Sequence, residues 1–78
     1  MMPVYHVTLR GEYKDWSGNW RDEGIQIVEC IHAVNDEDAK KQLRLLKVSR
    51  YPDYYSDGKP SRRYVVTEFV ELRAIPFG

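Results

Sequence analysis

The segment Ile25–Leu46 constrains the fold of this chain of 78 residues more than any other segment. It reads IQIVECIHAVNDEDAKKQLRLL, in which an apolar strand pattern passes through a polar turn directly into an amphipathic helix pattern. Asn35 is a favourable N-cap, and the order of acidic residues first and basic residues last suits the helix macrodipole. Three apolar residues recur at helical spacing and form one stripe: Ala39, Leu43 and Leu46. We therefore expect a strand over Gly24–Val34, then a helix of about 13 residues that ends near Ser49.

A strand is expected on each side of this segment. Pro3–Tyr13 alternates between apolar and polar residues, as a half-buried strand does. Gly11 interrupts its apolar face, at a bulge or where another side chain crosses the strand. Tyr64–Ile75 is rich in residues that favour strands.

Neither the second nor the last of these strands has a purely polar face. In the second strand, either a bulge shifts the register near Ile27 and Val28, or both faces are partly covered. Four apolar side chains could lie on the sheet face away from the helix: Val28, Cys30, Val65 and Phe69. An exposed apolar sheet face is what a dimer or a docking site uses.

The order of elements predicts a single α+β domain over residues 1–78. A helix of about 20 Å carries the chain back along the sheet, so the last strand can run antiparallel to the first. We expect a three-stranded antiparallel sheet (β-β-α-β) with the first strand central and one helix packed on one face.

Composition excludes several classes of protein. Twelve basic and twelve acidic side chains give a formal net charge of zero, which argues against a dedicated nucleic-acid binder and against a DNA mimic. Cys30 is the single cysteine, so an intramolecular disulfide is impossible and a reducing compartment is favoured. No apolar run reaches membrane length, and no basic-then-apolar leader is present. We expect a cytoplasmic protein without a membrane partner.

The sequence carries no recognisable catalytic or phosphate-binding motif, since GxGxxG, GxxxxGK[ST] and GxSxG are all missing. Cys30 in mid-strand has no feature of an activated thiolate. Cys30 and His32 share a strand face and His6 could lie beside them, but the CxxC and HxxxH spacings of metal sites are missing. We expect no enzymatic activity, no catalytic residue, no metal and no cofactor.

Two polar segments are candidate contact surfaces. In the expected hairpin connection Lys14–Glu23, Trp16 and Trp20 flank the tip. They either fold back on the core as a lid or stand out as partner anchors, because Trp is enriched among interface hot spots.

The second candidate is Arg50–Arg63, an irregular segment with a strong turn signal at Asp57-Gly58. Its tyrosines and basic residues could hold single-stranded nucleic acid, or the tyrosines could pack over the open end of the sheet. Asp53 and Asp57 dilute the positive charge and favour the second alternative. The two segments give these candidate partner-binding residues: Trp16, Trp20, Arg21, Arg50, Tyr51, Tyr54, Tyr55, Lys59, Arg62 and Arg63.

The segment Ile31–Ala39, IHAVNDEDA, resembles a strand-to-helix joint of small phage and mobile-element proteins, anti-CRISPR inhibitors among them. The resemblance implies a non-enzymatic inhibitor that occupies a surface of a CRISPR surveillance complex, in the host cytoplasm if the protein is phage-encoded.

We therefore expect a non-enzymatic protein-binding inhibitor whose partner is a host protein or ribonucleoprotein complex. Two alternatives stay open. One is a weak nucleic-acid-binding module that uses the basic, tyrosine-rich loop. The other is a structural homo-oligomer, such as a homodimer, joined through the outer sheet face.

Overall fold

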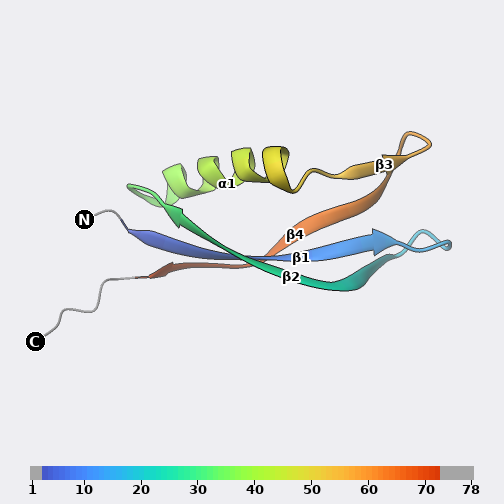
Figure 1. The fold of residues 1–78 in the computed structure, drawn as a ribbon, viewed down its shortest axis with the longest axis horizontal. Helices are drawn as coiled ribbons and strands as arrows, with labels where there is room; N and C mark the ends of the chain where they lie inside the picture. Colours follow the sequence, from blue (N-terminus) through green and yellow to red (C-terminus); the bar gives the residue numbers. More distant parts are fainter. Residues whose placement is uncertain (1–2, 73–78) are drawn as a thin grey trace, which may run out of the picture.

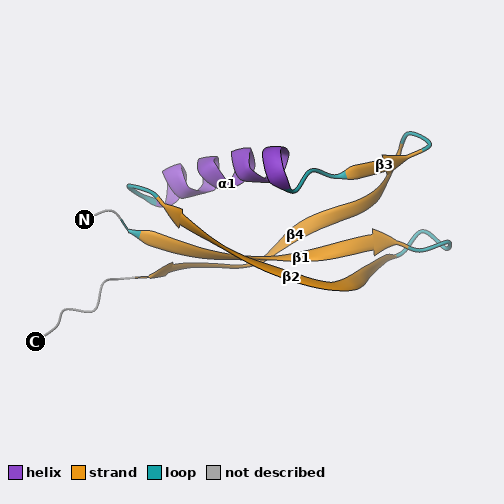
Figure 2. Cartoon of the chain, viewed as in Figure 1, coloured by secondary structure: helices purple, strands orange, loops and turns teal. Residues whose placement is uncertain are grey.

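The computed structural model describes residues 3–72, and these residues form one helix and four strands (Figures 1 and 2). In chain order the elements are β1 (Val4–Lys14), β2 (Trp20–His32), α1 (Asp36–Arg50), β3 (Tyr54–Ser56) and β4 (Lys59–Leu72). The strands form one sheet in the order β2-β1-β4-β3, and every neighbouring pair is antiparallel. The α+β class and the antiparallel sheet are confirmed.

The expected three-strand sheet is wrong, because the described residues hold a fourth strand at the edge next to β4, which changes the strand order. Asp57 and Gly58 both have positive φ, 52° and 75°, the conformation that Asp-Gly favours in tight hairpin turns. The chain therefore reverses there, and β3 pairs with the start of β4 inside the segment expected to be irregular. As a result β4 begins at Lys59 rather than at Tyr64, while its expected end at Ile75 lies outside the described residues.

The start of α1 is built as the sequence indicates. Oδ1 of Asn35 accepts a hydrogen bond from the backbone N–H of Asp38 at 2.8 Å, so Asn35 is the N-cap. Oδ2 of Asp38 in turn accepts from the backbone N–H of Val34 at 3.1 Å. The backbone N–H groups of Val34 and Asp38 therefore both have acceptors, and these two hydrogen bonds stabilise the junction between β2 and the helix.

The core is small and lies between α1 and the half of the sheet that holds the start of β1 and the end of β2 (Figure 1). Its buried apolar residues are Tyr5, Val7, Leu9, Ile31, Ala33, Ala39 and Leu43. The Tyr5 hydroxyl donates to Oδ1 of Asp36 at 2.9 Å and ties the central strand to the first turn of the helix. Burial and this carboxylate raise the pKa of Tyr5 to about 12. Leu45 and Val48 of the same helix face solvent.

Gly11 combines the two roles expected for it. The pairing of β1 with β2 shifts between Arg10 and Glu12, so an irregularity lies there. A Cβ on Gly11 would meet the Cβ of Ile25 at 3.2 Å and a ring carbon of Tyr64 at 3.6 Å, because both side chains cross the strand at this point. The alternative of a bulge near Ile27 and Val28 is wrong.

A second irregularity lies in β4. Thr8 pairs with Glu68 and Leu9 with Val66, so Thr67 is an extra residue that reverses the alternation of faces. Phe69 therefore lies on the helix side, with its ring centroid 5.3 Å from that of Tyr5. The expectation that Phe69 faces outward is wrong. The outer face instead presents apolar residues from two strands: Val28, Cys30, Val70 and Leu72.

The domain is elongated because both hairpins run far beyond the core. Its principal extents are 55 × 21 × 15 Å, and its Cα radius of gyration is 15.3 Å. A compact domain of this length has a radius of gyration of about 11 Å. The helix covers one half of the sheet, and the other half ends in the two hairpin turns (Figure 2).

Candidate protein-binding site at the hairpin end

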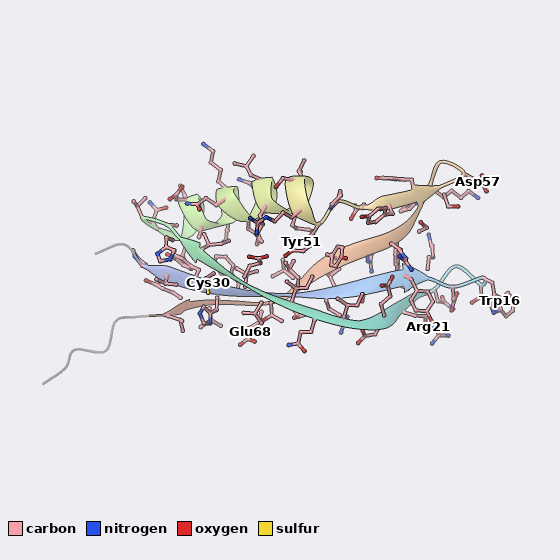
Figure 3. The ribbon with its side chains drawn as sticks, viewed as in Figure 1. Trp16, Arg21, Cys30, Tyr51, Asp57 and Glu68 are labelled. Carbon is pink, nitrogen blue, oxygen red and sulfur yellow. The ribbon has the colours of Figure 1, made fainter. Side chains whose placement is uncertain are left out.

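Both hairpin turns lie at the same end of the molecule, opposite the end where β1 begins and β4 ends (Figures 1 and 3). The β1–β2 turn carries Trp16 and the β3–β4 turn carries Asp57, both at this end in Figure 3. Arg62 of β4 pairs with Tyr13 on one side and with Tyr54 on the other, so the two hairpins belong to one continuous sheet. We call residues 13–21 together with residues 54–63 the hairpin end.

Asp15 organises the β1–β2 turn. Its Oδ1 accepts hydrogen bonds from the backbone N–H of Ser17 at 3.0 Å, the Ser17 hydroxyl at 2.8 Å and the backbone N–H of Asn19 at 2.8 Å. Its Oδ2 accepts from Nε of Arg21 at 2.8 Å. Arg21 and then the Asn19 amide hold the pKa of Asp15 well below its usual range. The carboxylate is therefore charged at neutral pH, and the turn is ordered before any partner arrives.

Trp16 stands out from this turn with 99% of its surface exposed. The sequence left open whether the tryptophans cover the core or stand out, and Trp16 lies at the extreme end of the molecule (Figure 3). A side chain of this size in water gives the free domain no stability. It can, however, supply a large contact area to a partner at low conformational cost.

Trp20 is half-buried and has a different role. The Arg63 guanidinium lies 4.0 Å above its ring centroid, and Nζ of Lys14 lies 5.4 Å from it. Arg63 also donates through Nε to Oε1 of Glu12 at 2.8 Å. Trp20 is thus neither a lid on the core nor a free anchor. It belongs to a cluster beside the Trp16 turn that we call the polar platform: Glu12, Lys14, Trp20 and Arg63.

Glu12 is the charged centre of that platform and is almost fully buried. Besides Arg63 it binds Nη2 of Arg10 at 2.7 Å. Arg63 first and Arg10 second lower the pKa of this carboxyl group, against the opposing effect of burial. The sequence analysis missed both Glu12 and Asp15, although the run Asp15-Trp-Ser-Gly-Asn carries a signal for an Asx turn.

The four arginines expected in the site are all ion-paired within the chain. Arg21 pairs with Asp15, and Arg63 pairs with Glu12, both at 2.8 Å. Arg62 binds Glu23 at 3.1 Å, while the contact of Arg50 with Glu29 is longer, at 3.7 Å. The positive charge of these four arginines is therefore compensated by carboxylates from β1, from β2 and from the turn between them.

The structure separates the expected site residues into two groups. The hairpin end brings together Trp16, Trp20, Arg21, Tyr54, Tyr55, Lys59, Arg62 and Arg63. Arg50 and Tyr51 lie at the end of α1 instead. The Tyr51 ring centroid is 5.1 Å from that of Tyr64, and its hydroxyl donates to the Glu29 carboxylate, which raises the pKa of Tyr51. Tyr51 is thus a packing residue, as the sequence allowed for this loop.

His6 pairs directly with Cys30, and His32 follows on the same strand face, as the sequence suggested. Within residues 3–72, however, His, Cys, Asp and Glu side chains form no group of three or more that could hold a metal ion. The same part of the chain contains no helix long and apolar enough to cross a membrane.

Comparisons with protein-family models, with curated proteins and with solved structures gave no match.

Proposed function

We propose that this protein is a non-catalytic binding domain that docks its hairpin end on a partner protein, with Trp16 as the anchor. The observation that carries the proposal is the exposure of Trp16 on a turn that Asp15 already fixes. Binding by an ordered turn loses little conformational entropy, so more of the contact energy appears as affinity.

The surroundings of Trp16 support a protein partner over nucleic acid. Arg21, Arg62 and Arg63 have their charges compensated, so they suit the polar rim of a protein interface better than a series of phosphate contacts. Tyr54 adds an exposed aromatic ring from the second hairpin. Binding to nucleic acid would weaken steeply with salt, whereas docking through Trp16 would change little, so a salt titration separates the two functions.

The resemblance of Ile31–Ala39 to small anti-CRISPR proteins suggests the first partner to test. We propose that the domain is an inhibitor that occupies a surface of a CRISPR surveillance complex in the host cytoplasm. The experiment is a plaque assay with a CRISPR-targeted phage on hosts that express the wild-type protein or a variant.

We expect the wild-type protein to restore plaque formation and Trp16→Ala to lower the affinity for the purified complex by about tenfold or more. Cys30→Ser, on the outer sheet face, is the matched control and should behave like the wild type. If folded Trp16→Ala, Trp20→Ala and Arg62→Ala/Arg63→Ala variants all keep full inhibition, docking through the hairpin end is wrong.

One further observation favours a second candidate function, a homodimer joined through the outer sheet face. Val28 is 57% exposed there, and Val70 and Leu72 lie on the same face. Sedimentation at high protein concentration tests this alternative, and monomeric behaviour would exclude it.

A further inference from the structure

A groove next to the hairpin end, with which it shares Tyr55, has no role in the docking of Trp16. It lies between the last turns of α1 and the start of β3, with a volume of about 510 Å³. Its lining residues are Arg44, Lys47, Val48, Tyr51, Pro52, Asp53 and Tyr55. We call it the helix-end groove.

The groove continues an apolar stripe on the solvent side of α1. Val48 is 76% exposed and Leu45 is 63% exposed, one turn apart on the helix. Tyr55, 65% exposed on β3, lines the groove together with Val48. Helix surfaces that face solvent are normally polar, and here the buried stripe of Ala39 and Leu43 already packs against the sheet. The apolar solvent side therefore has no partner within residues 3–72.

The charges around this stripe are positive and uncompensated. Arg44 and Lys47 line the groove, and Lys41 lies one turn before Leu45 on the same stripe. Over residues 3–72 none of these three side chains forms an ion pair, in contrast to the arginines of the hairpin end. Asp53 is the acidic member of the lining. An apolar strip with a free cationic rim is complementary to an acidic segment that carries apolar side chains.

We propose that the helix-end groove binds an acidic segment of a partner protein, with one aromatic or branched aliphatic side chain between Val48 and Tyr55. The carboxylates of that segment would lie against Lys41, Arg44 and Lys47. Nucleic acid fits less well, because the Tyr51 ring of the lining is held by Glu29 and Tyr64 and is not free to stack on a base. This surface goes beyond the Trp16 site and does not depend on it.

The test is a titration of ¹⁵N-labelled protein with a short synthetic peptide in which Asp and Glu alternate with Leu and Phe. Three further probes are the same peptide with Lys in place of Asp and Glu, the same peptide with Ser in place of Leu and Phe, and a short oligothymidylate. We expect the acidic apolar peptide alone to shift the amide signals of residues 41–55. Val48→Ser and Lys47→Glu should each weaken its binding by about tenfold.

Two variants serve as controls. Lys59→Glu makes the same charge change at the hairpin end, and Trp16→Ala removes the anchor of the proposed function, so both should bind the peptide as the wild type does. Val48 is exposed, so its substitution should leave the fold intact.

Four results would overturn the proposal. They are no binding of the acidic apolar peptide, equal binding of the Lys-containing or Ser-containing peptide, shifts that map outside residues 41–55, and tighter binding of oligothymidylate. Concentration-dependent self-association that Val48→Ser abolishes would also overturn it, since a second copy would then be the occupant.

Discussion

At the scale of single residues, two carboxylates decide how the hairpin end is built. Asp15 fixes the turn that presents Trp16, and Glu12 links Arg10, Arg63 and the platform around Trp20. The sequence identified the tryptophans and arginines by residue type, but it could not pair them with their carboxylates. The pair of Arg63 with Glu12 joins residues 51 positions apart in the chain and depends on the register between β1 and β4.

The Glu12 pairs give a definite pH dependence of stability. The pKa of Glu12 is lower in the folded protein than its ordinary 4.5, so its stabilising effect is present above that value and is lost as the pH falls through the folded pKa. We expect Glu12→Gln to lower the free energy of unfolding at neutral pH by about 1–2 kcal/mol. In urea denaturation, this difference from the wild type should shrink as the pH falls below 4.5.

Glu68→Gln is the matched control, because within the described residues Glu68 forms no ion pair. A Glu12→Gln variant with a constant deficit between neutral and acidic pH would show that Glu12 is not stabilised in its charged form.

At the scale of elements, the sequence predicted those whose signals are local. Asn35, the acidic first turn and the apolar stripe were enough to place α1. It did not predict β3, because the three residues of this strand are all exposed and show no apolar alternation. The prediction that Phe69 faces outward was also wrong, because the hydrophobic periodicity of the sequence does not reveal the extra residue Thr67 in β4.

The cap of α1 can be tested by substitution. We expect Asn35→Ala to lower the free energy of unfolding by about 1 kcal/mol, because the N–H of Asp38 loses its acceptor. Asn35→Ser keeps a side-chain oxygen at that position and should recover most of the loss in thermal or urea denaturation. Equal stability of the Ala variant and the wild type would mean that the cap bond contributes nothing.

Leu43 and Leu45 are a matched pair on the same helix. Leu43 is buried in the core, so Leu43→Ala should cost about 2–4 kcal/mol in unfolding free energy. Leu45 faces solvent, so Leu45→Ala should change that free energy by no more than about 0.5 kcal/mol. A large loss for Leu45→Ala would place this side chain in the core and remove it from the apolar stripe that continues the helix-end groove.

At the scale of the whole molecule, the long hairpins separate the part that holds the fold from the part proposed to bind. The core sits under α1 at the end where β1 begins and β4 ends, and Trp16 lies at the opposite end (Figure 3). Composition and periodicity predicted the α+β class, but they could not predict this shape. It depends on how far the paired strands extend beyond the helix.

The elongation can be measured in solution. We expect small-angle scattering to give a radius of gyration near the 15.3 Å of the Cα atoms and a mass of one chain. A value near the roughly 11 Å of a compact domain would mean that the hairpins fold back. A doubled mass would favour the dimer through the outer sheet face.

The most direct measurement of the central claim is site-specific photo-crosslinking from position 16. Benzoylphenylalanine replaces Trp16 in one variant and Glu68, on the outer sheet face, in another, and both are irradiated in the cells that produce the protein. We expect position 16 to give one discrete adduct with another protein and position 68 to give none. An adduct from position 68 with none from position 16, or no adduct from either, would contradict docking through the hairpin end.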